Sequence, residues 1–96
     1  MEIKKIKTIY KCENVEIKQA VVSAREVTVQ EGKVTDIASG TIKIDGRGFG
    51  FAVSSREDED GQNNELVYNI NRVPIGVDAY NIIKAFIAYI EQHINL

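Results

Sequence analysis

Residues 40–54 read GTIKIDGRGFGFAVS, and this stretch decides the fold. Polar and apolar residues alternate on both sides of Asp45-Gly46, a pair that suits a two-residue type I′ turn. With these two residues in the turn, Ile42 pairs with Phe49, and every second residue shares a face. The predicted core face holds Ile42, Ile44, Arg47, Phe49, Phe51 and Val53. The stretch therefore predicts an antiparallel hairpin with one apolar face and one thin, polar face.

Further strands are predicted on both sides of this hairpin. Residues 3–10 mix isoleucine and lysine as a strand does, and residues 66–70 alternate as a last strand. Residues 30–33 contain a glycine between two valine-rich segments, which is typical of a hairpin turn. Residues 14–24 fit both strand and helix spacing; strand is favoured, and helix stays open.

A helix is predicted at the C-terminal end, with Asp78 as its N-cap. Its apolar residues recur at helical spacing and form a wide stripe, typical of a helix laid on a sheet. The stripe consists of Ala79, Ile82, Ile83, Phe86, Ile87, Ile90 and Ile94. The opposite side has few charges, chiefly Lys84 and Glu91. We therefore expect one α+β domain over residues 1–96: a curved antiparallel sheet of five to seven short strands, with one C-terminal helix packed across one face.

The charge of the chain is small but unevenly distributed. The 96 residues carry a net charge of −2, which does not fit a nucleic-acid polycation. Five acidic residues lie within residues 57–65, and we expect residues 56–65 to form an acidic, mobile loop. This run lacks the ligand spacing of a calcium-binding loop, so we expect no metal site there.

Cys12 is the only cysteine and His93 the only histidine. One of each cannot supply a Cys/His metal cluster within a chain, and no nucleophile, acid and base are placed in evident reach of each other. We expect Cys12 to be a small, half-buried apolar residue and His93 to lie near the helix end. The sequence thus predicts no catalytic residues, no cofactor and no enzyme activity. The single cysteine and the lack of a long apolar segment favour a cytoplasmic location.

The segment Arg47-Gly48-Phe49-Gly50-Phe51 resembles the first ribonucleoprotein motif of RNA-recognition and cold-shock domains. That resemblance implies that Phe49 and Phe51 stack on bases, that Arg47 contacts phosphate or base, and that Tyr68 joins them. It covers about 14 of 96 residues. Ile44 stands where cold-shock domains carry an exposed aromatic residue, and a helix replaces their closing strands.

Two functions are compatible with these patterns. The favoured one is a small, non-catalytic protein-interaction module, such as an adaptor, an inhibitor or a mobile-element accessory protein. Its expected partner is another protein or a second copy of the chain, since the thinly charged helix face favours a homodimer. The alternative is a single-stranded nucleic-acid-binding domain that uses Arg47, Phe49, Phe51 and Tyr68. No membrane partner is expected.

Overall fold

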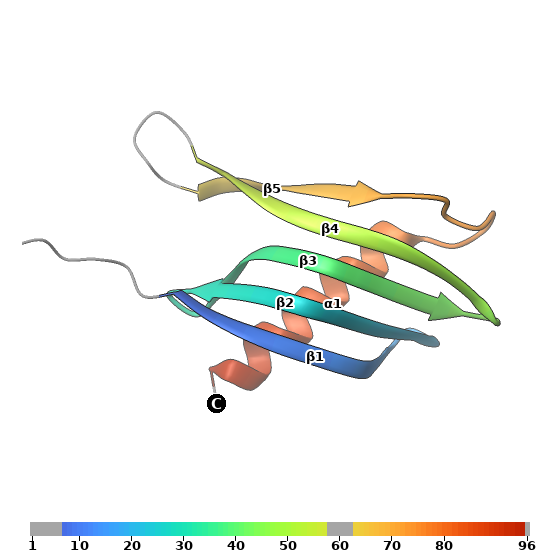
Figure 1. The fold of residues 1–96 in the computed structure, drawn as a ribbon, viewed down its shortest axis with the longest axis horizontal. Helices are drawn as coiled ribbons and strands as arrows, with labels where there is room; N and C mark the ends of the chain where they lie inside the picture. Colours follow the sequence, from blue (N-terminus) through green and yellow to red (C-terminus); the bar gives the residue numbers. More distant parts are fainter. Residues whose placement is uncertain (1–6, 58–62, 96) are drawn as a thin grey trace, which may run out of the picture.

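In the part of the chain that the structure describes, five strands are followed by one helix (Figure 1). The structure is a computed structural model that describes residues 7–57 and 63–95. The elements are β1 (Lys7–Ile17), β2 (Ala20–Gln30), β3 (Lys33–Ile44), β4 (Arg47–Glu57), β5 (Asn63–Ile70) and α1 (Ala79–Ile94). The strands form one sheet in the order β1-β2-β3-β4-β5, and each pairs antiparallel with the next. This arrangement confirms the predicted α+β fold.

Three two-residue turns connect the first four strands. Both residues have positive φ in Lys18-Gln19, Glu31-Gly32 and Asp45-Gly46, which is the backbone of a type I′ turn. The turn at Asp45-Gly46 sets the predicted register, because Ile42 pairs with Phe49. The sequence prediction for the central hairpin is therefore confirmed.

Two segments differ from, or refine, the sequence prediction. Residues 14–24 are extended and are divided by the Lys18-Gln19 turn, so the strand interpretation is correct and the helical spacing there is coincidental. The expected loop at 56–65 is shorter at both ends, because β4 runs through Glu57 and β5 starts at Asn63. Arg56 pairs with Glu65 across these strands, so the hairpin continues into the acidic segment. Residues 58–62 lie outside the described residues.

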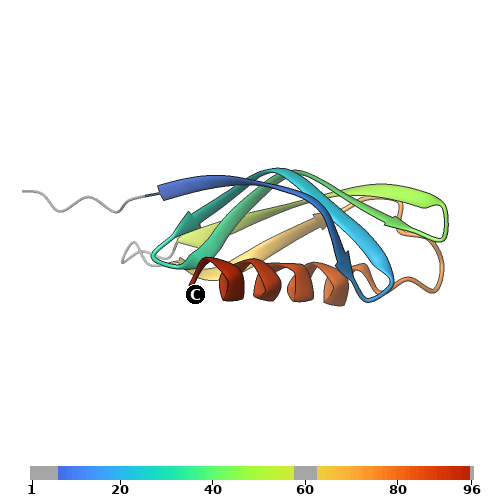
Figure 2. The same cartoon turned by 90° about the horizontal axis from the view of Figure 1, so that it is seen from below.

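Helix α1 crosses one face of the sheet (Figure 2), and its backbone comes close to β1 and β3. The predicted stripe faces the sheet: all its members are buried except Ile94, which is half-buried at the end of α1. Phe86 lies at the centre, with its ring edge-to-face against Phe51 at 6.3 Å between centroids. The core is therefore a single layer of valine, isoleucine and phenylalanine between sheet and helix.

Polar contacts anchor α1 at both ends. Asp78 is the N-cap, as predicted, and its Oδ1 accepts a hydrogen bond from the backbone N–H of Asn81 at 3.2 Å. Near the other end, Glu91 Oε2 accepts a hydrogen bond from the backbone N–H of Val34 at 2.9 Å. Asn95 Nδ2 donates to the carbonyl oxygen of Gly32 at 3.1 Å. Glu91 is thus not a solvated far-side charge, as the sequence suggested, because its carboxylate accepts the N–H of Val34 on β3.

Bulges bend the sheet near the middle of its strands. The pairing of β1 with β2 shifts twice, around Cys12, and Asn14 has φ of 54°. The pairing of β3 with β4 shifts between Ile37 and Gly40, and Ser39 has φ of 54°. An extra residue on one strand increases the local twist and bend. The sheet therefore curves over the helix (Figure 2).

Candidate interaction surfaces

The aromatic residues of the Arg-Gly-Phe-Gly-Phe segment lie beneath the helix. Phe49 and Phe51 are each 5% exposed and belong to the core between sheet and α1. The Phe51 ring also lies over Gly40, where an added Cβ would come within 2.5 Å of the ring. Arg47 is exposed at the start of β4. Base stacking needs an accessible ring face, so in this fold the nucleic-acid alternative loses the two residues that carried it.

Tyr68, the fourth residue of that alternative, lies half-buried on β5. Its ring packs edge-to-face against Tyr80 of α1, with the centroids 4.9 Å apart. The Lys84 ammonium lies 5.2 Å from the centroid of the Tyr80 ring. Burial raises the pKa of the Tyr68 phenol, and the neighbouring Tyr80 and Glu91 raise it further. The four residues of the nucleic-acid alternative therefore do not form one surface: two are core, one is at the β3–β4 turn and one supports α1.

The face of the sheet opposite α1 carries a polar depression where the bulges line up. Its volume is about 530 Å³, and it is wide open to solvent. Polar and charged residues of β1, β2 and β3 line it: Lys11, Glu13, Asn14, Ser23, Arg25, Ser39 and Thr41. Sequence patterns did not indicate this depression, because bulges interrupt the alternation from which strand faces are predicted.

Short contacts fix the β1 side of this depression. Lys11 Nζ lies 2.8 Å from Glu13 Oε1, and the hydrogen bond and charge of Lys11 lower the pKa of Glu13. The backbone N–H of Asn14 donates to Ser23 Oγ at 2.9 Å, which satisfies a group that the bulge releases from the ladder. The depression can offer hydrogen bonds to a polar ligand from several directions. Its charged side chains are solvated, so it holds no desolvated charge that would select one ligand class.

Cys12 and His93 occupy the places the sequence suggested. Cys12 is half-buried beside the core at β1, and burial raises the pKa of its thiol, which disfavours the reactive thiolate. His93 is exposed in the last turn of α1, where its ring lies against Tyr89 with centroids 4.0 Å apart. Within residues 7–57 and 63–95, no three metal-ligating side chains of the His, Cys, Asp and Glu types gather in one place.

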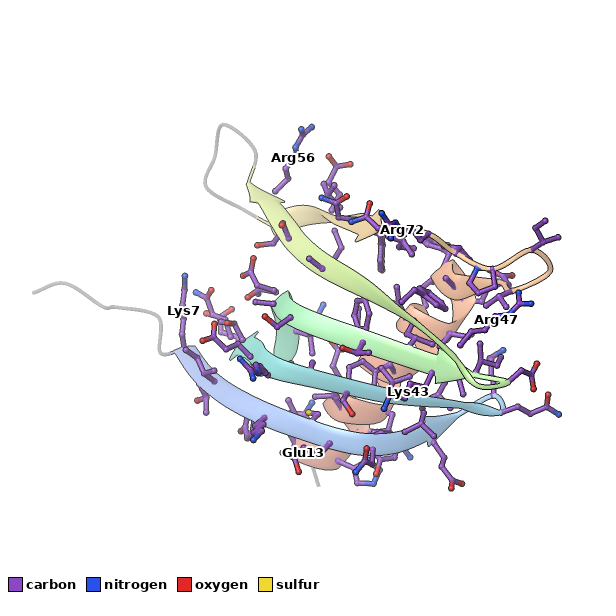
Figure 3. All side chains as sticks on the ribbon, turned by 45° about the vertical axis from the view of Figure 1, so that its right-hand side comes forward. Lys7, Glu13, Lys43, Arg47, Arg56 and Arg72 are labelled. Atoms are coloured by element: carbon purple, nitrogen blue, oxygen red, sulfur yellow. The ribbon has the colours of Figure 1, made fainter. Side chains whose placement is uncertain are left out.

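The two edges of the sheet have different chemistry. The pairing register of β1 with β2 shifts twice. Four exposed charged residues are spread along β1: Lys7, Lys11, Glu13 and Glu16. Charges and bulges on an edge strand hinder its pairing with another strand. Figure 3 shows Lys7 and Glu13 along this edge.

On β5, by contrast, residues 66–71 carry no charge. From Arg56 to Phe51, the pairing of β4 with β5 is regular. Figure 3 shows Arg56 near one end of β5 and Arg72 just beyond the other end. Within the part of the chain that the structure describes, β5 is hydrogen-bonded only to β4, so its outer edge presents free backbone groups.

Several exposed apolar side chains lie on β5, on the segment after it and in the first turn of α1. Among residues 7–57 and 63–95, seven large apolar residues are exposed, and four of them lie within residues 67–80. We call these four residues, together with the edge of β5, the β5 margin: Val67, Val73, Ile75 and Tyr80. Ile75 is fully exposed, at 101% of its reference area. The exposure of these four residues depends on how far α1 and the sheet extend, which periodicity does not specify.

None of the helices in residues 7–57 and 63–95 has the length and apolar character needed to cross a bilayer. Comparisons with models of protein families, with curated proteins and with solved structures found no match for this chain.

Proposed function

We propose that this chain is a non-catalytic protein-interaction module whose binding surface is the β5 margin. The observation that carries the proposal is that β5 and the residues just after it hold four of the seven exposed large apolar side chains found in residues 7–57 and 63–95, while the outer edge of β5 has free hydrogen-bonding groups. Apolar contacts and unpaired strand groups are the two features by which sheet edges bind other chains. The free thiol of Cys12 supports a cytoplasmic location for this module.

The margin combines a rigid part with an adaptable part. Val67 is held on a paired strand, and Tyr80 is supported by its contact with Tyr68. Val73 and Ile75 lie on the segment between β5 and α1, which is joined to β4 by the hydrogen bond of Asn71 N–H to the Gly50 oxygen and contains a turn closed by Val77 N–H to the Pro74 oxygen. Because only one of these two bonds reaches another element, the segment can adjust the positions of both side chains to a partner.

A matched pair of substitutions tests this proposal. Ile75→Asp places a charge on the margin, and Ile9→Asp places the same charge on the other edge, where Ile9 is 63% exposed. Tagged parent and variants are incubated with extract of the native cell, and the retained proteins are quantified by mass spectrometry and then purified for calorimetry. We expect a protein that binds the parent and Ile9→Asp alike, with affinity for Ile75→Asp reduced at least about tenfold, or about 1.4 kcal/mol. Equal retention by all three chains would reject the β5 margin as the binding surface.

The nucleic-acid alternative is tested separately by fluorescence anisotropy with short single-stranded DNA and RNA. Because Phe49 and Phe51 are buried, we expect no salt-sensitive binding by the folded parent. Binding at low salt that disappears in a still-folded Arg47→Ala variant would favour the alternative function instead.

A further inference from the structure

We infer that β5 pairs antiparallel with β5 of a second copy, about a two-fold axis at Val67, so that two five-stranded sheets join into one. This inference rests on the proposed function and names one partner for the β5 margin. The structural basis is the direction of the backbone groups of β5, the charges at its ends and the residues that such pairing covers.

The outer edge of β5 has backbone groups that are free to pair. The N–H of Asn71 donates to the Gly50 oxygen, so at this position β5 directs its groups toward β4. Along an antiparallel strand, the backbone N–H and C=O groups of successive residues point alternately to one neighbouring strand and to the other. Val67 and Asn69 therefore also bond toward β4, and Leu66 and Tyr68 direct their N–H and C=O groups outward. The N–H of Ser55, which pairs with Leu66, donates instead to Asp36 Oδ1 at 3.4 Å, consistent with this alternation. The outward groups form the template for one more strand.

Pairing about Val67 brings apolar side chains of the two copies together. With the axis at Val67, each Val67 faces its counterpart, and Leu66 faces Tyr68 of the second copy. Opposite residues share a face in an antiparallel pair, so both α1 helices lie on the same side of the joined sheet. Apolar and aromatic residues then meet across the junction, which is the favourable class of cross-strand pair. Val67, the residue on the proposed axis, is 42% exposed in the single chain.

The two ends of β5 carry opposite charges. Glu65 stands at the start of the uncharged stretch and Arg72 just past its end. An antiparallel arrangement sets Glu65 opposite Asn69 of the second copy and directs it toward the end where the second Arg72 lies. A parallel arrangement would instead set Glu65 near Glu65 and Arg72 near Arg72. The charges therefore favour the antiparallel, self-complementary pairing, which is the closed symmetry that dimers use.

The edge of β1 does not offer the same opportunity. It carries Lys7, Lys11 and Glu13, and its register shifts around Cys12. A second copy of β1 would meet both charges and an irregular row of backbone groups. If each copy pairs only through β5, no further edge is available and the assembly stops at two copies.

Sedimentation equilibrium over a series from micromolar to millimolar concentration tests the inference on the full chain. We expect the parent to dimerise as concentration rises. Val67→Lys, which sets two ammonium groups opposite each other, should raise the dimer dissociation constant at least about tenfold. Ile9→Lys is the matched control on β1 and should dimerise like the parent, and circular dichroism melts check that both variants fold.

A disulfide readout fixes the register. In a Cys12→Ser background, Val67→Cys places two thiols at a pair whose Cα atoms are about 4.5 Å apart, within disulfide range. Under mild oxidation this variant should form covalent dimers, and Ile9→Cys in the same background should not. A parent that stays monomeric at millimolar concentration, or a dimer insensitive to Val67→Lys, would overturn the inference. Neither result touches the proposed function, since that is tested by Ile75→Asp against a different protein.

Discussion

The strands at the two edges of this sheet, β1 and β5, have the same position in the fold and opposite surface chemistry. β1 carries exposed lysine and glutamate and loses its regular register around Cys12. β5 is uncharged from Leu66 onward and keeps a regular register with β4. The sheet of a two-layer domain has two edges at which other chains can pair. This chain disfavours pairing at β1 and leaves it open at β5, and this contrast is why we propose β5 as the edge that pairs.

The two edges also differ in what supports them from below. On the β5 side of the sheet, two pairs of aromatic rings support the strands. Phe51 of β4 packs against Phe86, and Tyr68 of β5 packs against Tyr80. Beneath β1, the support is aliphatic, with Ile17 buried and Cys12 and Val15 packed beside the core. The predictions that follow perturb one edge at a time.

The largest effect is expected from Phe51→Ala. Phe51 is buried, touches Phe86 and pairs with Ile70 of β5. Its loss should lower the free energy of unfolding by about 3–5 kcal/mol, the range for a buried phenylalanine. Urea titration measures this loss, and Ser54→Ala on the uncovered face of β4 is the control, expected within about 0.5 kcal/mol of the parent. Hydrogen exchange should show β5 amides losing more protection than β1 amides; equal losses would contradict the difference in support.

A moderate effect is expected from Asn14→Val on β1. Asn14 has φ of 54°, in the left-handed region that a β-branched residue disfavours. We expect a loss of about 1–2 kcal/mol in thermal or urea unfolding, the cost of that backbone region for ordinary residues. Asn14→Gly keeps the conformation accessible and should leave stability nearly unchanged. If both variants unfold like the parent, the bulge does not constrain this edge.

A smaller effect is expected from Tyr80→Ala on the β5 side. Tyr80 is about half exposed, so its main contribution is the edge-to-face contact with Tyr68. Losing that contact should cost about 0.5–1.5 kcal/mol, as measured for aromatic pairs. A double-mutant cycle with Tyr68→Leu isolates the pair, and a coupling energy near zero would show that the two rings do not support each other.

The smallest effect is expected on stability at alkaline pH. Each edge carries one group whose pKa is raised, mainly by burial: Cys12 on β1 and Tyr68 on β5. When the folded pKa exceeds the unfolded pKa, the stabilising contribution is complete below the unfolded pKa and is lost as pH rises through the folded pKa. Melting temperatures measured from about pH 8 to about pH 11 should therefore fall, over the range where thiols and then phenols titrate. Cys12→Ser should flatten the early part of this decline and Tyr68→Phe the late part. An unchanged slope in both variants would mean that other groups cause it.

The sequence was sufficient for the central hairpin and the helix, because both have strong local signals. Asp45-Gly46 specifies its turn and hence the pairing of Ile42 with Phe49. Asp78 and the stripe after it specify the start and the buried side of α1. The turn at Lys18-Gln19 had no such signal, since tertiary pairing holds two ordinary residues at positive φ there.

The surfaces were harder to predict than the core. A bulge at Asn14 or Ser39 inserts one residue without changing composition. The polar depression therefore cannot be predicted from the alternation of polar and apolar residues. The exposure of Val67 and Ile75 is set by where the neighbouring layers end, which is a three-dimensional property. The turn at Asp45-Gly46 pairs Phe49 with Ile42, and this pairing alone predicts the core position that both phenylalanines have.

The position of α1 after all five strands has a consequence for biosynthesis. The first three hairpins close through two-residue turns and form from local contacts, whereas the helix must return to β3, where Val34 and Glu91 are 57 residues apart. Ribosomes add about 5–20 residues per second, so the 16 residues of α1 follow β5 by on the order of a second. During that interval the apolar face of a nascent sheet is uncovered. We expect a chain stalled before Ala79 to be a chaperone substrate, and ribosome-nascent-chain crosslinking to show that contact ending once α1 has emerged.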